Sequence, residues 1–223
     1  SDVFAMIGAG KLDTVEEIHI KDADNAIHPD YDVFTLWCPR DMLEEITMNA
    51  AVYDGGEIKW LPPLSRSEKY AFPDPIGSHK IYNTTHEETF LIPRFLKDVK
   101  YVDFMIVVPD KLAEFANMIR KMGLHGLKPV RVDGLEVKPL DVVAACMPDP
   151  VTLVERIRGS AGIIVEAVGL KHNERQMVKT WIAMTHEEAF ARYRTSATGY
   201  MVGTGAAIGI EMLVSGDIRK SGF

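Results

Sequence analysis

Residues 162–184, GIIVEAVGLKHNERQMVKTWIAM, hold two apolar arms on either side of the polar loop KHNER. Both arms, 162–170 and 176–184, are rich in the β-branched and aromatic side chains that favour extended backbone. Two such arms around a short polar loop predict a β-hairpin of two long antiparallel strands. We therefore expect the fold to be built around a sheet that contains this hairpin.

Other segments add strands and helices to this sheet. Residues 99–108, VKYVDFMIVV, form the strongest strand signal in the chain, and the capped helix 110–123 follows, ended by Gly123. Val15, Ile18 and Ile20 outline a further strand, although the spacing between Val15 and Ile18 breaks the alternation. The fold class predicted is α+β, a mixed and largely antiparallel sheet flanked by helices.

Further helices are expected where apolar residues recur at helical spacing. They are a first helix capped by Ser1, one from Pro39 that carries Met42, Leu43, Ile46 and Ala50, a short one that begins with His86 and stops near Pro93, and one from Pro139 to Pro148. Asp54–Gly56 and Asp133–Gly134 predict turns.

Composition narrows the classes of partner. The chain has 223 residues, 32 acidic against 25 basic, and a formal net charge of −7. Such an acidic balance argues against nucleic acid and membrane as partners, so small molecules or proteins remain. We find no apolar run of the roughly 18 residues that a membrane helix needs and no leader pattern, which predicts a cytoplasmic location. Cys38 and Cys146 are expected to be reduced, packing thiols.

Several catalytic motifs are incomplete. The triplet HEE occurs at 86–88 and at 186–188, but phenylalanine stands at 90 and 190, where a zinc protease would need its second histidine. No metal site is predicted. The segment IGAGKLD at 7–13 lacks the third glycine of a dinucleotide fingerprint and precedes a strand, so we exclude that motif too.

The C-terminal run 185–218 joins a charged, histidine-bearing turn to a long helix of small residues. Gly199, Gly203, Gly205 and Gly209 lie inside this helix, and each costs roughly 1 kcal/mol relative to alanine. Close packing must offset that cost. One interpretation is a core helix packed tightly on the sheet, and the other is a helix packed against a nucleotide-binding domain.

Four segments carry a family resemblance. FTLWCPRDMLEE at 34–45 leads to AAVYDGGEIKWLPPL at 50–64, and HEETFLIPRFLKDVKYVDFMIVVPDKL (86–112) and VKPLDVVAACMPDP (137–150) come before the C-terminal run. In this order they resemble the catalytic, C-terminal half of the saccharopine dehydrogenase family. The resemblance implies hydride transfer at a C–N bond of an amino-acid-derived amine, with NAD or NADP held mainly by a Rossmann half that is missing here.

The same resemblance implies how the chain is organised. Residues 1–195 would be a substrate-binding and dimerisation domain, and residues 196–223 a terminal helical segment returning towards the absent Rossmann domain. A homodimer is expected, and the chain alone is expected to be inactive. The choice between NAD and NADP stays open, because the residue that reads it would lie in the Rossmann half.

Candidate site residues follow from the chemistry of such substrates. Imine chemistry needs a group that titrates near neutrality, which makes His86 and His186 the catalytic candidates. Ammonium and carboxylate groups need partners of opposite charge or aromatic walls, and cofactor contacts need hydroxyls. Trp37, Arg40, Glu87 and Arg194 are therefore the substrate-binding candidates, and Thr195 and Thr198 the cofactor-binding ones. Surface solvation, packing or helix capping is the simpler interpretation of each of these residues taken singly.

The reaction within the family is left open. The HEE triplet and the PDP that follows a helix look similar to the carboxynorspermidine dehydrogenase branch, which joins a semialdehyde to a diamine in polyamine biosynthesis. Saccharopine and lysine dehydrogenases, of lysine metabolism, are the rivals. A hypothesis of another class is a non-catalytic binding or dimerisation module.

Overall fold

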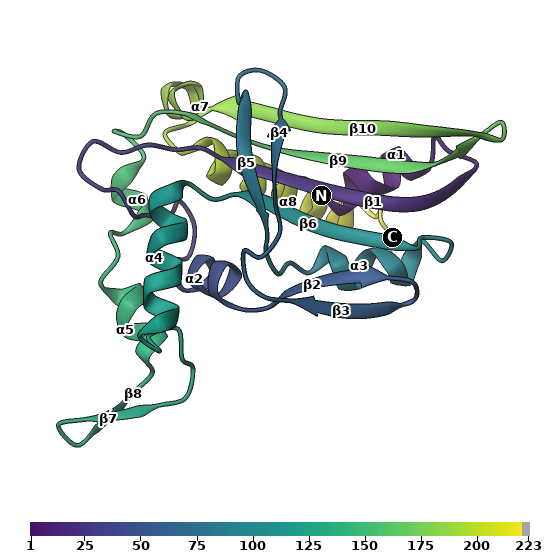
Figure 1. The fold of residues 1–223 in the computed structure, drawn as a ribbon. Helices are drawn as coiled ribbons and strands as arrows, with labels where there is room; N and C mark the ends of the chain where they lie inside the picture. The colour runs from purple at the N-terminus through teal and green to yellow at the C-terminus, as the bar shows by residue number, and fades with distance from the viewer. Residues whose placement is uncertain (220–223) are drawn as a thin grey trace.

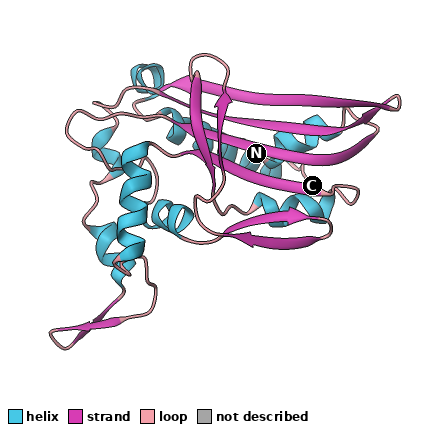
Figure 2. Ribbon diagram, viewed as in Figure 1, coloured by secondary structure: helices cyan, strands magenta, loops and turns pink. Residues whose placement is uncertain are grey.

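The protein, described over residues 1–219 of a computed structural model, is built on one eight-stranded sheet with helices packed around it (Figures 1 and 2). The order β10-β9-β1-β6-β2-β3 makes up most of the sheet, and β5 joins the β4–β5 hairpin to β6. These strands are β1 (Thr14–Asp24), β2 (Ala50–Asp54), β3 (Glu57–Leu61), β4 (Ser67–Ala71), β5 (Ser78–Asn83), β6 (Tyr101–Val107), β9 (Ser160–Lys171) and β10 (Glu174–Thr185). The predicted α+β class is confirmed.

A separate small hairpin projects from the body at the lower left of Figure 1. Its strands are β7 (Val130–Val132) and β8 (Leu135–Val137), and the predicted turn at Asp133–Gly134 joins them. The helices are α1 (Asp2–Ala9), α2 (Pro39–Thr47), α3 (Glu88–Phe95), α4 (Asp110–Lys121), α5 (Pro139–Ala145), α6 (Pro150–Leu153), α7 (His186–Tyr193) and α8 (Ala197–Ser215). Helices α1 and α3 lie on one face of the sheet, and the β4–β5 hairpin crosses the other face (Figure 1).

The predicted hairpin forms one end of the sheet. β9 and β10 pair antiparallel from Lys171 and Glu174 at the turn to Ser160 and Thr185. β1 then pairs antiparallel with β9 and parallel with β6, which makes the sheet mixed. The broken alternation near Val15 is a β-bulge against β9. Opposite it, a Cβ at Gly169 would lie 1.9 Å from the Thr14 carbonyl oxygen, so the backbones approach too closely for any other residue.

The main core lies between the helix face of the sheet and the helices. Ile18, Ile20 and Phe104 from the strands meet Met42 and Leu43 of α2 there, and all are buried. A smaller cluster that includes Ala23, Ile81 and Ile164 lies under the β4–β5 hairpin. The alternation of β1 explains this division, because its even-numbered residues from Ile18 to Asp24 face the helices and its odd-numbered residues face the hairpin.

Several local predictions need correction. Helix α3 begins at Glu88 instead of His86 and continues past Pro93 to Phe95, because Ile92 packs into the main core and outweighs the lost backbone bond at the proline. Helix α2 ends at Thr47, and Ala50 opens β2. Cys38 and Cys146 are free thiols, but both are exposed at helix ends, so the expectation that they pack in the interior was wrong.

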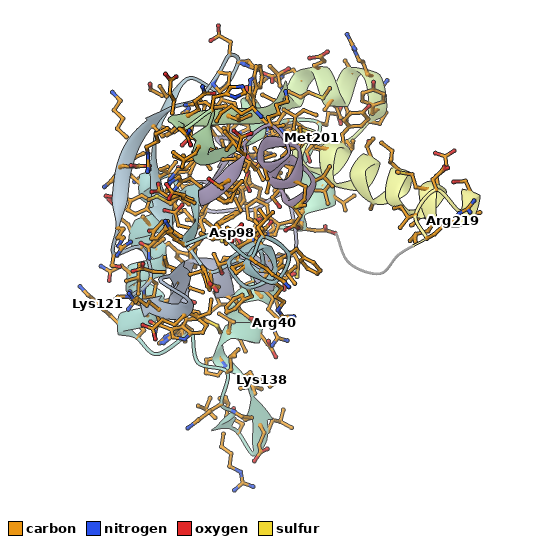
Figure 3. All side chains as sticks on the ribbon, turned by 90° about the vertical axis from the view of Figure 1, so that its right-hand side faces the viewer. Arg40, Asp98, Lys121, Lys138, Met201 and Arg219 are labelled. Atoms are coloured by element: carbon orange, nitrogen blue, oxygen red, sulfur yellow. The ribbon has the colours of Figure 1, made fainter. Side chains whose placement is uncertain are left out.

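Helix α8 is the least embedded element. Only its first residue, Ala197, is buried, and the helix runs outward from Met201 towards Arg219 (Figure 3). A Cβ added at Gly203, Gly205 or Gly209 would meet nothing within 4 Å. The interpretation of a tightly packed core helix is therefore wrong.

The same helix also corrects the statement that no run is long enough to span a membrane. By length and composition, the 19 residues Ala197–Ser215 pass that test. The core helices of soluble proteins pass the same test, but they are mostly buried, whereas α8 is mostly exposed. The expectation that the protein has no membrane partner stays a prediction.

Candidate active site

Two acidic residues of β1 stand on the helix face of the sheet, Asp22 and Asp24. They come at the carboxyl end of β1, where the parallel strand β6 also ends. Each lies near one of the two HEE triplets, since His86 acts electrostatically on Asp22 and His186 contacts Asp24 directly. The histidines of the two triplets, which are distant in sequence, therefore lie beside the same strand, β1.

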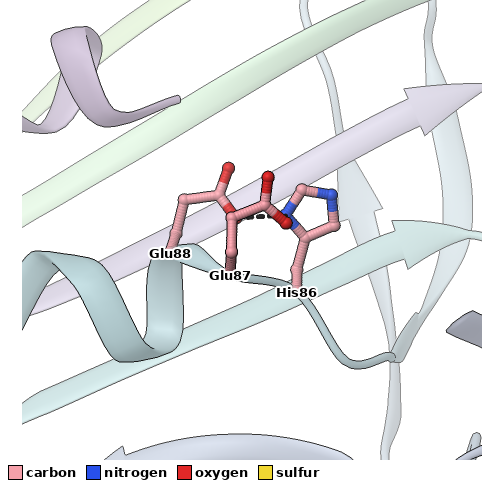
Figure 4. A group of neighbouring side chains, drawn as sticks. All are labelled: His86, Glu87 and Glu88. Atoms are coloured by element: carbon pink, nitrogen blue, oxygen red, sulfur yellow. Dashed lines mark hydrogen bonds and ion pairs between the residues drawn. The ribbon is translucent and has the colours of Figure 1, made fainter.

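His86 is the centre of the first group of side chains. Its ring stacks on Phe104 of β6 with the centroids 4.0 Å apart, and its Nδ1 pairs with the carboxylate of Glu88 (Figure 4). Glu88 is almost completely buried and also accepts a hydrogen bond from the Ser1 hydroxyl. Burial favours neutral His86, yet the hydrogen bond and negative charge of Glu88 prevail and raise the pKa of His86 to about 9. His86 is thus an imidazolium at neutral pH.

Two further carboxyl groups around His86 titrate near neutrality. Burial raises the pKa of Glu45, on α2, to about 7, although the positive charge of His86 opposes this. Burial likewise raises the pKa of Asp22 to about 6, and His86 again opposes it. Carboxyl groups with such pKa values can both accept and return a proton at physiological pH, as acid–base catalysis requires.

The first HEE triplet also has donor atoms that suit a metal ion. One ligand atom from each of His86, Glu87 and Glu88 lies within 4.8 Å of the others. A metal would have to displace the proton that His86 shares with Glu88, because an imidazole ligand binds through a nitrogen lone pair. The prediction that the chain has no metal site is not tested by this geometry.

His186 has a different environment. It is completely buried, its Nδ1 accepts a hydrogen bond from the Ala197 backbone N–H at 3.2 Å, and its Nε2 lies 3.3 Å from Asp24 Oδ1. Because Nδ1 is an acceptor, the proton must be on Nε2, where it is donated to Asp24. Thr198 donates a hydrogen bond of 2.5 Å to Asp24 Oδ2. Both nitrogens of His186 are engaged, so here it links β1 to the start of α8.

A cavity of about 470 Å³ opens at the carboxyl ends of β1 and β6. Trp37, Tyr31 and Phe34 provide aromatic walls. The charged residues of its lining carry both signs: Asp24, Asp32, Asp110, Lys80 and Lys111. A site with both signs of charge and aromatic walls suits a ligand that carries ammonium and carboxylate groups on an aliphatic chain.

The structure brings only some of the predicted site residues together. Trp37 lines this cavity, His86 and Glu87 belong to one cluster, and His186 and Thr198 meet at Asp24. Arg40 lies on the surface, where it pairs with Glu44 and Asp141, and Arg194 ends α7 with its guanidinium over the Phe190 ring.

Thr195 has a local role beside the cap of α8. Its hydroxyl oxygen would lie 2.7 Å from a Cβ at Gly199, which explains the glycine there. The substrate and cofactor roles of Trp37, Arg40, Glu87, Arg194, Thr195 and Thr198 stay predictions.

Sequence reasoning did not select Asp22, Asp24 or Glu45. Asp22 and Asp24 lie beyond Val15, Ile18 and Ile20, which outlined the strand in the sequence, and β1 continues through Asp24. The available signal was an acidic residue at every second position after Ile18 and Ile20, which places the acids on the core-facing side of a strand. Charged residues on such a face need partners or a function.

Residues 15–223 match the model of the saccharopine dehydrogenase C-terminal domain. The chain belongs to the saccharopine dehydrogenase family. The match covers nearly the whole sequence and confirms the family resemblance that the sequence indicated. Members of this saccharopine dehydrogenase family are oxidoreductases that generally use NAD(P).

The curated relatives that the chain resembles are named carboxynorspermidine synthase and carboxyaminopropylagmatine dehydrogenase. It is 28% identical to the carboxynorspermidine synthase of Vibrio cholerae over 99% of the chain and 53% of that protein, and 29% identical to that of Vibrio alginolyticus over 92% and 49%. A carboxyaminopropylagmatine dehydrogenase of Synechocystis is 24% identical over 84% of the chain and 47% of that protein. The chain thus spans about half the length of the curated relatives it matches.

A solved structure supports the fold. The saccharopine dehydrogenase (L-Glu forming) of Saccharomyces cerevisiae superposes with a TM-score of 0.59 and 12% identity, covering 94% of this chain and 61% of that one. At this identity the likeness concerns the fold alone.

Proposed function

We propose that this chain is the substrate-binding part of an NAD(P)-dependent oxidoreductase that reductively joins an amino-acid semialdehyde to a diamine. The curated relatives support this choice over saccharopine or lysine as substrate, because two are named carboxynorspermidine synthases and the third is a carboxyaminopropylagmatine dehydrogenase. The reaction would thus belong to polyamine biosynthesis, and the enzyme would be an oxidoreductase that acts on a CH–NH group.

The observation that carries the proposal is the position of Asp24. Asp24 lines the aromatic cavity of mixed charge. Asp22 lies two positions earlier on the same face of β1, where it interacts electrostatically with His86 and Glu45. An ammonium group bound in the cavity would therefore lie near carboxyl groups that exchange protons at neutral pH.

The proton steps of such a reaction match these groups. A diamine must lose a proton before its nitrogen attacks an aldehyde, and the carbinolamine hydroxyl must gain one to leave as water. Glu45 and Asp22, with pKa values of about 7 and about 6, are suited to take and return that proton. His86, held as an imidazolium by Glu88, would keep the local potential positive enough for these acids to ionise.

NAD(P)H would supply the hydride that reduces the imine. The glycine-bearing segment Ile7–Asp13 ends α1 and leads into β1, instead of joining a strand to a helix as a dinucleotide fingerprint does. We therefore propose that residues outside this chain hold most of the cofactor, with Thr195 and Thr198 beside it at the start of α8. A homodimer and a cytoplasmic location also remain predictions from the sequence.

The test is turnover by the protein that carries this chain, expressed from its own gene. NADH or NADPH absorbance would be followed with an amino-acid semialdehyde and 1,3-diaminopropane, together and singly, and in reverse with saccharopine or lysine. We expect coenzyme oxidation only when aldehyde and diamine are both present. Glu45→Gln should lower kcat at least tenfold, whereas Arg192→Gln, on the exposed face of α7, should not.

Two results would overturn the proposal. Coenzyme reduction with saccharopine or lysine alone would place the protein in lysine metabolism. No coenzyme use with any of these substrates, while 1,3-diaminopropane still binds in a calorimetric titration, would support the non-catalytic binding module instead.

A further inference from the structure

A second hollow region lies at the far end of the helix pair α2 and α4. Its larger part, about 700 Å³, is lined by residues that include Asn49, Trp60, Arg120 and His125. A smaller cavity of about 210 Å³ shares Pro63 and Arg120 with it, so the two adjoin at the Arg120 side chain. We call these two together the Arg120 groove.

The groove is separate from the candidate active site. The active-site cavity contacts α4 from Asp110 to Leu112, whereas the larger part of the groove contacts it at Arg120 and the smaller part between Ala113 and Arg120. Arg120 lies eight residues beyond Leu112, which is about 12 Å along the helix. The groove and the active-site cavity share no lining residue, so each can be tested by substitutions outside the lining of the other.

The electrostatics of the groove differ from those of the rest of the molecule. The chain carries 32 aspartates and glutamates, yet neither part of the groove is lined by one. Over residues 1–219, the half-buried Arg120 side chain has no hydrogen bond or ion pair. Arg40 and Arg175, by contrast, both pair with carboxylates. A part-buried guanidinium without a counter-charge favours binding of an anion.

Other lining residues indicate what the anion is attached to. Asn49, with an amide donor, and His125, with an imidazole, line the same cavity as Arg120. Trp60 is 58% exposed and contacts the Phe90 ring, with the two ring centroids 5.9 Å apart. An indole ring attracts planar or apolar groups.

We propose that the Arg120 groove binds an oxyanion, a carboxylate or a phosphate, carried on a planar or apolar body, with Arg120 as its principal partner and Trp60 as the wall for that body. The site goes beyond the proposed oxidoreductase activity and does not depend on it. A forked guanidinium would hold such an oxyanion through two parallel hydrogen bonds.

The test is a calorimetric titration of the full chain with benzoate, acetate and inorganic phosphate. We expect benzoate to bind more tightly than acetate, because only benzoate reaches the indole, and Trp60→Ala should remove that difference. Arg120→Gln should weaken binding of every anion at least tenfold, and Arg120→Lys should weaken it less. Arg192→Gln is the matched control, since it removes an equal charge from a surface pair on α7.

The outcomes separate the possible ligands. Phosphate binding more tightly than benzoate would assign the groove to phosphate-bearing ligands, and the reverse to carboxylates. Absence of binding by all three anions would overturn the proposal. Equal weakening by Arg120→Gln and Arg192→Gln would overturn it too, because it would show that only net charge matters. Circular dichroism and thermal unfolding of each variant, with Arg120→Lys as the milder change, separate lost binding from lost folding.

Discussion

Replacing Glu88 with glutamine removes the charge that keeps His86 protonated while preserving the size of the side chain. In the native protein the pKa of His86 is raised from 6.5 to about 9 despite burial of the ring. At 1.36 kcal/mol for each pKa unit, the net shift corresponds to roughly 3 kcal/mol, in which the opposing cost of burying the charge is outweighed by the acidic neighbours of the ring. Burial of the ring then opposes the charged form without its main counter-charge, so we expect the pKa of His86 to fall towards its ordinary value of 6.5.

The sign of the pH dependence follows from the raised pKa. A histidine whose pKa is higher in the folded state stabilises the fold fully below its unfolded value of 6.5, and this contribution is lost as the pH rises through about 9. The native protein should therefore lose stability across this interval, and Glu88→Gln should lose little. At pH 7 the variant should be less stable by about 2 kcal/mol, allowing for the neutral hydrogen bond that glutamine can still make.

Two measurements check this prediction. Ring-proton NMR titration gives the pKa of His86, and urea unfolding between pH 6 and pH 10 gives the free energy of unfolding. Glu87→Gln is the matched control, because Glu87 also approaches His86 Nδ1, at 3.2 Å, but its side chain is 69% exposed. If both variants lowered the pKa of His86 equally, or if Glu88→Gln left it near 9, the assignment of Glu88 as the controlling charge would be wrong.

Three further predictions test other parts of the structure. Glu45→Gln should stabilise the fold by about 1–2 kcal/mol at pH 8 but not at pH 4 in urea unfolding, because burial raises the pKa of Glu45 to about 7 and its ionisation opposes folding; equal effects at the two pH values would contradict this. His186→Ala should lower the free energy of unfolding by about 3–4 kcal/mol and speed hydrogen exchange at the start of α8, because it removes a partner of the Ala197 N–H and of Asp24. The control His172→Asn, in the β9–β10 turn, should lower it by less than about 0.5 kcal/mol. Gly169→Ala should lower the free energy of unfolding by more than about 3 kcal/mol, because its Cβ would overlap the Thr14 carbonyl, whereas Gly203→Ala should raise the melting temperature slightly. Comparable losses of stability in the two variants would refute the close approach at the bulge.

Local patterns in the sequence predicted most of the fold. The composition of residues 162–184 predicted the β9–β10 hairpin, and the uneven spacing after Val15 corresponds to the bulge in β1. One of the exceptions is α3, where the pattern placed a helix end near Pro93. Packing of Ile92 against the sheet, which no local signal reports, carries the helix further.

The candidate site could be predicted only in part, because its contacts join distant segments. His86 and His186 were selected for their chemistry, but their different states depend on neighbours supplied by the topology. Asp24 reaches His186 across 162 positions of sequence because β1 lies beside β9 in the sheet. Burial, which moves Glu45 and Asp22 into the neutral range, likewise depends on how α2 packs and cannot be derived from residue spacing.

The central place of β1 has a consequence for biosynthesis. Its neighbours are β6 and β9, so one of its edges stays unpaired until the chain beyond Ser160 has left the ribosome. At bacterial and eukaryotic elongation rates this interval is on the order of ten seconds. During it, the nascent chain exposes an apolar strand edge that can pair with other chains. Slower translation of the segment between β6 and β9 should therefore lower the soluble yield without any change in the native state.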